Sequence, residues 1–186
     1  ADTALSERLH GRSVALSSAN SINVGRLVPQ VVYYVDAYAQ LVRSSAISLG
    51  DAVDFCVPTG NFGDVLAGYY AKRLGLPVRR LVVASNANDV LTDFLTTGTY
   101  DKRRPFVKTI SPSMDILVSS NLERLLYFAS DGDAELVSSL MADLADKGAY
   151  TVPPALLARI QETFSCGRAD DEMARETIRT TWEHCH

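Results

Sequence analysis

The sequence predicts an α/β fold, a three-layer αβα sandwich with a mainly parallel sheet and a helical C-terminal tail. Residues 53–57 alternate between apolar side chains and Asp54 and Cys56, and residues 81–84 form a continuous apolar run; both patterns are typical of strands. Between them lie a glycine-containing loop and a segment, residues 65–74, whose apolar residues recur at helical spacing. Gly75 and Pro77 end that helix, so these segments form a β-α-β unit with the usual right-handed connection.

The N-terminal part contains one more predicted strand and a long helix. A short apolar run at residues 14–16 leads into the polar stretch 17–20, which is typical of a buried strand that ends in a loop. From residue 22 to 49 apolar residues recur at helical spacing. We expect Ser21 to cap this helix and Pro29 to set a kink or a late start.

After the β-α-β unit, Asn88 is predicted to cap a short helix over residues 89–95 that Gly98 ends. An irregular segment follows over residues 99–119. It is longer than most loops in compact domains, so we expect it to be functional or disordered. Four more helices are predicted, over residues 122–129, 134–146, 154–164 and 170–183.

Length and composition favour a single globular domain. The chain has 186 residues, of which 47% are hydrophobic and 22% charged. We expect residues 1–130 to form a central α/β part and residues 131–186 a helical extension of the same domain. A formal charge of −4 without a large basic cluster argues against a nucleic-acid partner. No stretch approaches the ~20 apolar residues of a membrane span, so no membrane partner is expected.

The cysteines are Cys56, Cys166 and Cys185, without a C-x-x-C pair, which favours reduced thiols in a cytoplasmic protein. The end of the chain, His184-Cys185-His186, cannot direct three adjacent side chains at one ion from a regular helix, so no metal site is predicted. The sequence starts without Met and stops inside a helical pattern, from which we expect a piece of a longer protein.

The sharpest local feature is the run Gly60-Asn61-Phe62-Gly63-Asp64, between a predicted strand and a predicted helix. Glycines allow close approach of a ligand, and the free N–H groups at a helix start favour an anion, most simply a phosphate. The alternative is a tight connection without a ligand. The run is neither a Walker A nor a G-x-G-x-x-G sequence, which disfavours nucleoside triphosphates and dinucleotides. We expect the Asp64 carboxylate to turn back to the helix N-terminus.

A second group of polar residues, Asn20, Ser21, Asn23 and Arg26, lies where a loop enters the long helix. We call these four residues the anion cluster, because amide, hydroxyl and guanidinium donors together suit a phosphate or a carboxylate. A structural interpretation has equal weight. In it, Ser21 caps the helix, Asn20 and Asn23 satisfy turn backbone, and Arg26 forms a surface ion pair.

Several longer motifs resemble the threonine synthase family. SANSINVGRLVPQ (18–30), VPTGNFGD (57–64) and LAGYYAKRLGLP (66–77) stand in that family's order. The resemblance continues downstream and weakens after residue 131. Its further motifs are ASNANDVL (84–91), SPSMDI (111–116) and SSNLERLL (119–126).

The resemblance implies a fold-type-II enzyme that uses pyridoxal 5'-phosphate (PLP). It implies that Gly60, Asn61, Phe62, Gly63 and Asp64 hold the cofactor phosphate, with Phe62 packing more than touching the ligand. It implies that the anion cluster forms part of the pocket for O-phospho-L-homoserine. The family's reaction converts this substrate and water to L-threonine and phosphate, with the cofactor as electron sink.

The family's central residue is the lysine that forms the internal aldimine, ahead of these motifs in a Ser-x-Lys-Asp setting. None of the lysines present, Lys72, Lys102, Lys108 and Lys147, stands in such a setting. We therefore expect no catalytic residue in this chain, an aldimine lysine upstream in the remaining segments of the parent enzyme, and an inactive isolated chain. The alternatives are a related PLP-dependent phospho-lyase, a serine/threonine dehydratase, and a non-catalytic domain that keeps the phosphate loop. Dehydratases are disfavoured because they usually carry a run of glycines in this loop.

Overall fold

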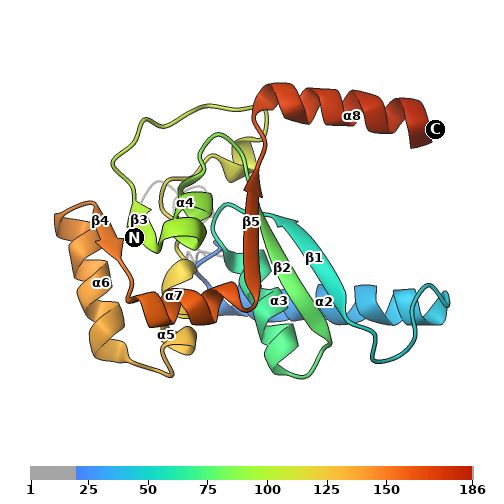
Figure 1. Cartoon of the computed structure of the whole chain (residues 1–186), viewed down its shortest axis with the longest axis horizontal. Coiled ribbons are helices and arrows are strands. Elements are labelled where there is room, and N and C mark those ends of the chain that lie inside the picture. The colour runs from blue at the N-terminus through green and yellow to red at the C-terminus, as the bar shows by residue number, and fades with distance from the viewer. Residues whose placement is uncertain (1–19, 186) are drawn as a thin grey trace, which may run out of the picture.

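The computed structural model describes residues 20–185, so the strand predicted at residues 14–16 and the terminal His186 lie outside the described residues. A three-stranded parallel sheet forms the centre, in the order β1-β2-β5 (Figure 1). Its strands are β1 (Val53–Pro58), β2 (Val78–Ser85) and β5 (Phe164–Arg168). The predicted αβα fold with a mainly parallel sheet and a helical end is confirmed.

Helices pack around this sheet in the predicted order. Their bounds are α2 (Val24–Arg43), α3 (Gly63–Arg73), α4 (Val90–Thr97), α5 (Leu122–Ala129), α6 (Ala134–Asp146), α7 (Pro154–Gln161) and α8 (Asp171–Cys185). Helix α3 packs on β1 and β2 and is covered by α2, whereas α4 packs on β2 and β5. Helix α8 follows β5 and projects from the rest of the described chain (Figure 1).

Two strand features were not predicted. The helix predicted over residues 154–164 ends at Gln161, and the chain then enters β5. This strand pairs with β2, with Phe164 opposite Leu81. The irregular segment contains β3 (Thr99–Asp101), which pairs antiparallel with β4 (Ala149–Thr151), and the short 3-10 helix η1 (Pro112–Met114). Both pairings join segments that are distant in the chain, and no local pattern announces such a partner.

Two predicted helix caps are wrong. Asn23, not Ser21, caps α2, because its side-chain oxygen accepts the backbone N–H of Gly25 at 2.8 Å. Asn88 does not cap α4, where the N-cap position is Asp89 and carries no side-chain cap bond. Helix α2 begins ahead of Pro29, so this proline does not set a late start, and the helix ends at Arg43 rather than near residue 49.

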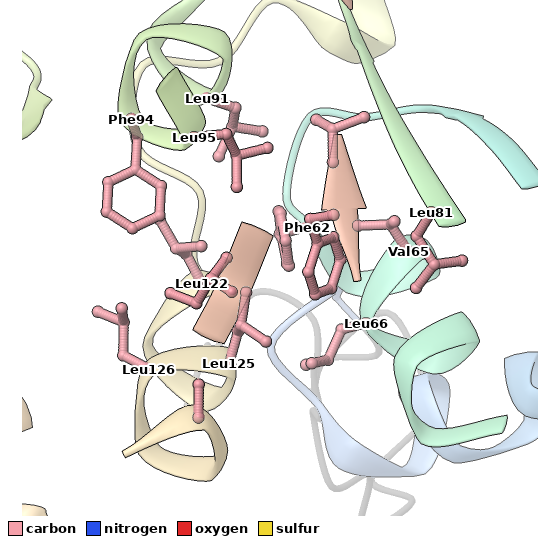
Figure 2. Close-up of a cluster of buried hydrophobic side chains, with 14 of the residues drawn as sticks. Phe62, Val65, Leu66, Leu81, Leu91, Phe94, Leu95, Leu122, Leu125 and Leu126 are labelled. Carbon is pink, nitrogen blue, oxygen red and sulfur yellow. The ribbon is translucent and has the colours of Figure 1, made fainter. Parts of the chain in front are cut away.

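The hydrophobic core lies between the sheet, α3, α4 and α5 (Figure 2). Phe62 enters this core from the turn between β1 and α3, beside Val65 and Leu66, and its side chain is 1% exposed. The facing side chains come from α4 and α5, among them Leu91, Phe94, Leu95, Leu122, Leu125 and Leu126. Burying a phenylalanine contributes about 1.5–3 kcal/mol, so Phe62 anchors the turn that carries the candidate site.

Candidate functional site

The turn between β1 and α3, residues 60–64, presents a row of backbone donors. Within residues 20–185, no N–H group of this turn donates to a protein acceptor. Three of these residues, Phe62, Gly63 and Asp64, are at the start of α3, where helical geometry leaves N–H groups without an intrahelical partner. The turn is therefore neither continuous helix nor internally satisfied, and it offers donors and the positive end of the helix dipole to an anion.

The backbone of this turn is held in an uncommon shape. Phe62 has a φ of 64°, in the left-handed region that a non-glycine residue enters at a cost of about 1–3 kcal/mol. A Cβ atom on Gly60 would lie 3.0 Å from both the Ser113 carbonyl oxygen and the Ile116 Cδ1. A Cβ atom on Gly63 would lie 3.3 Å from the Asn121 Nδ2. Both glycines thus permit a close approach of backbone that a larger residue would disturb.

A pocket of about 290 Å³ lies against this turn. It is lined by the whole 60–64 turn, by Ser21, Arg26 and Gln30 from the other segment, and by Ser113. The structure thus brings part of the anion cluster to the turn. The other two members, Asn20 and Asn23, do not line the pocket, and their side-chain oxygens accept the N–H groups of Ile22 (3.1 Å) and Gly25 (2.8 Å).

Asp64 does not follow the expectation that its carboxylate returns to the helix N-terminus. Instead, the Tyr34 hydroxyl donates to the Asp64 carbonyl oxygen at 2.9 Å and to its Oδ1 at 3.2 Å. Burial raises the pKa of Tyr34, and the negative Asp64 adds to the rise, so this hydroxyl stays protonated as a donor. The pair ties α2 to the first turn of α3.

Asn121 connects the two sides of the pocket, a role that the sequence did not reveal. It is 0% exposed and lies at the N-cap position of α5. Its Nδ2 donates to the carbonyl oxygens of Ser21 (2.9 Å) and Asn61 (3.0 Å). The only available signal was its place in the SSNLERLL motif, which says nothing of its partners.

The neighbouring turn, between β2 and α4, carries a dense polar network. Asp115 accepts the N–H and the hydroxyl of Thr109 (3.0 and 2.7 Å) and the amides of Asn86 (2.8 Å) and Asn88 (3.1 Å). The backbone N–H of Thr109, followed by its hydroxyl and the two amides, lowers the pKa of Asp115. This network fixes the segment that brings Ser113 to the pocket.

Asp89, next to this network, bridges two arginines. Its 12%-exposed carboxylate pairs with Arg104 at 2.7 Å and with Arg168 at the end of β5. Arg104 also pairs with Asp93 of α4 at 2.7 Å. These ion pairs hold the long segment 102–119 against the carboxyl edge of the sheet.

Known sequences and solved structures resemble this chain, although family models do not. No protein-family model matches the chain. A human protein named threonine synthase-like 1 is 47% identical over 168 residues, which is 90% of this chain and 23% of that protein. The threonine synthase of the yeast Saccharomyces cerevisiae is 37% identical over 177 residues, 90% of this chain and 34% of that enzyme. A PLP-bound threonine synthase from Brucella melitensis superposes with a TM-score of 0.85 at 43% identity, covering 98% of this chain and 37% of that one.

The predicted resemblance to the threonine synthase family is confirmed. The chain spans less than two-fifths of the length of these relatives. Its similarity therefore concerns one segment of the threonine synthase fold, the segment that carries the 60–64 turn and the pocket.

The lysines of this threonine synthase-like segment do not reach the pocket. Lys72 donates to the Arg79 carbonyl oxygen at 3.3 Å, and Lys147 pairs with Asp143 at 2.8 Å. Neither these two nor Lys102 and Lys108 line the pocket in the described part of the chain. Between residues 20 and 185 there is also no group of three metal-ligating side chains and no helix long and apolar enough to cross a membrane.

Proposed function

We propose that this chain is the cofactor-phosphate-binding and substrate-anion-binding segment of a PLP-dependent threonine synthase. Such an enzyme is a lyase of threonine biosynthesis that converts O-phospho-L-homoserine and water to L-threonine and phosphate. The observation that carries the proposal is the row of N–H groups at residues 60–64, which have no protein acceptor within residues 20–185, in a turn that lines the same pocket as Arg26. Because the chain spans only part of its relatives, the reaction is assigned to the full-length protein that contains it.

The residues of the turn fit a phosphate monoester such as that of PLP. The N–H groups of residues 60–64 supply several donors, and Gly60 and Gly63 keep Cβ atoms away from the approaching group. The Oδ1 of the Asp64 carboxylate accepts the Tyr34 hydroxyl, which partly offsets the repulsion it would exert on a phosphate. Phe62 contributes its backbone, because its side chain is buried in the core.

In this proposal each part of the segment has a separate task. When bound, PLP supplies an electron sink for carbanionic carbon. The 60–64 turn holds the cofactor by its phosphate. Ser21 and Arg26 bind the anionic end of the substrate at the opposite side of the pocket, and Asn20 and Asn23 shape the turn that precedes α2. The lysine that moves protons is proposed to lie upstream, in the remaining segments of the protein.

Arg26→Ala in the full-length protein tests the substrate role. We expect the KM for O-phosphohomoserine to rise about tenfold or more with PLP affinity retained, since a charge-assisted contact to the substrate is lost. Arg43→Ala, an exposed arginine at the other end of α2, is the matched control. Unchanged kinetics for Arg26→Ala would favour a surface ion pair and remove Arg26 from the site.

Reductive labelling tests the absence of the catalytic lysine. The isolated 186-residue chain, incubated with PLP and reduced with borohydride, should show low and scattered labelling and no threonine formation. The full-length protein should give one dominant labelled site upstream of Ala1. Stoichiometric labelling of Lys72, Lys102, Lys108 or Lys147 would place the catalytic centre inside this segment.

A related PLP-dependent phospho-lyase is the second candidate. The comparisons leave it as a candidate because they name no reaction for the human relative at 47% identity, which is called threonine synthase-like 1, and yeast threonine synthase is 37% identical. Release of phosphate from O-phosphohomoserine without threonine would identify this activity. Turnover of serine or threonine would identify a dehydratase, and PLP binding without turnover of any of these would identify a non-catalytic domain.

The organisation and location of the segment belong to the same proposal. We propose that residues 1–130 and 131–186 form one domain, which is supported by β5, since this strand lies in the second part and pairs with β2 of the first. A cytoplasmic location is supported by Cys56, Cys166 and Cys185, which are all free thiols in the structure.

A further inference from the structure

The two sides of the pocket come from segments that are far apart in the chain, and Asn121 is bonded to both. Its side-chain nitrogen uses both hydrogens, one on the carbonyl of Ser21 and one on the carbonyl of Asn61. Its backbone N–H donates to the same Asn61 carbonyl at 3.1 Å. One buried residue thus fixes the approach of the anion cluster to the 60–64 turn.

Arg124, one turn further along α5, fixes the orientation of the Asn121 amide. One guanidinium nitrogen donates to the Asn121 Oδ1, and the other donates to the Ile22 carbonyl oxygen at 2.7 Å. A flipped amide would place its oxygen against two carbonyl oxygens and its nitrogen against a cation. The partners therefore specify a single orientation, and Arg124 reaches the anion-cluster segment itself.

The bonds to the carbonyl groups also direct the N–H groups of the turn. A trans peptide is planar, so its C=O and N–H point in opposite directions. With the Asn61 carbonyl held by Asn121, the N–H of Phe62 points away from α5. The Gly60 carbonyl accepts the Ser119 hydroxyl at 2.5 Å, which orients the N–H of Asn61 in the same manner.

We propose that Asn121, backed by Arg124, is a positioning residue that aims the donors of the 60–64 turn and sets the distance from this turn to the anion cluster. The inference rests on the proposed function, because it assigns the two sides of the pocket to cofactor phosphate and substrate anion. It predicts that one side chain, which touches neither ligand, controls the affinity for both.

Asn121→Asp in the full-length protein tests the proposal. The carboxylate keeps the size of the side chain and its contact with Arg124, but it sets an oxygen against the carbonyls of Ser21 and Asn61. We expect the Kd for PLP and the KM for O-phosphohomoserine each to rise about tenfold. Glu123→Gln, an exposed change on the same helix, should leave both constants unchanged.

Arg124→Ala keeps the proposal testable if Asn121→Asp does not fold. It should raise both constants about threefold to fivefold, and added guanidinium ion should restore them, which a merely structural lesion would not allow. Normal PLP affinity and normal KM in the folded Asn121→Asp or Arg124→Ala variant would overturn the positioning role alone. Failure of the wild-type protein to bind PLP would instead remove the proposed function.

Discussion

Two turns leave the carboxyl edge of the same parallel sheet, and they use their polar groups in opposite ways. The β1–α3 turn, residues 60–64, leaves its N–H groups without protein acceptors in the described chain. In the β2–α4 turn, residues 86–89, the side chains of Asn86 and Asn88 donate hydrogen bonds to Asp115, and Asp89 forms ion pairs with two arginines. The turns are adjacent, because the Thr59 N–H donates to the Ala84 carbonyl oxygen at 2.9 Å.

The β1–α3 turn is suited to binding a ligand, whereas the β2–α4 turn supports the fold. Parallel sheets bind ligands beyond the carboxyl ends of their strands, so by position alone both turns are candidate ligand-binding sites. Satisfied polar groups stabilise the fold, whereas unsatisfied donors in a strained turn are available to a ligand. We therefore expect changes in the β1–α3 turn to alter ligand affinity and changes in the β2–α4 turn to alter stability.

The largest effect should come from Asn88→Ala in the second turn. Asn88 is 5% exposed and exchanges two hydrogen bonds with the Val107 backbone, at 2.9 and 2.8 Å, besides its contact with Asp115. Losing these part-buried hydrogen bonds should lower the free energy of unfolding by about 2–3 kcal/mol. Urea unfolding measures this, and the Kd for PLP should stay within twofold of wild type. A change in affinity without a loss of stability would reverse the assignment of the turns.

Gly60→Ala in the first turn should act on affinity instead. The new Cβ atom would lie 3.0 Å from the Ser113 carbonyl oxygen, so backbone beside the pocket must shift. We expect the Kd for PLP to rise about tenfold, which corresponds to about 1.4 kcal/mol. Gly167→Ala in β5 is the control, because a Cβ atom there meets nothing within 4 Å. Equal affinities in the two variants would mean that the turn does not contact the cofactor.

The smallest effect should be the contribution of Asp115 to the pH dependence of the free energy of unfolding. Its folded-state pKa is lowered, so its contribution to stability is complete above the unfolded-state pKa of about 3.9 and is lost as pH falls through the folded-state value. The stability difference between wild type and Asp115→Asn should thus be largest near pH 6 and shrink below pH 4. Urea unfolding at several pH values measures it, and a difference that stays constant with pH would contradict this linkage.

The sequence predicted those features that local signals encode. The β-α-β unit followed from the alternating and apolar strand patterns and from Gly75 and Pro77, and the position of residues 60–64 at a strand-to-helix junction followed from their glycines. The left-handed backbone of Phe62 was not predicted, because it depends on burial of the ring against residues such as Phe164. The centroids of these two rings are 5.6 Å apart.

Features that join distant segments could not be predicted in this way. Strand β5 has no alternating pattern and exists through its pairing with β2. Asn88 was assigned to a helix cap, the usual role of asparagine before a helix, but it bonds to a segment about twenty residues away. Asn121 likewise connects the two sides of the pocket only in the folded chain, where its side chain donates to the carbonyl oxygens of Ser21 and Asn61.

A crystal structure of the full-length protein with PLP would show directly whether the 60–64 turn binds the cofactor phosphate. We expect phosphate oxygens to lie within hydrogen-bond distance, about 2.7–3.2 Å, of two or more backbone nitrogens of residues 60–64, with Arg26 across the pocket. A phosphate bound elsewhere while these N–H groups face solvent, or a turn whose N–H groups are bonded within the protein, would contradict this expectation.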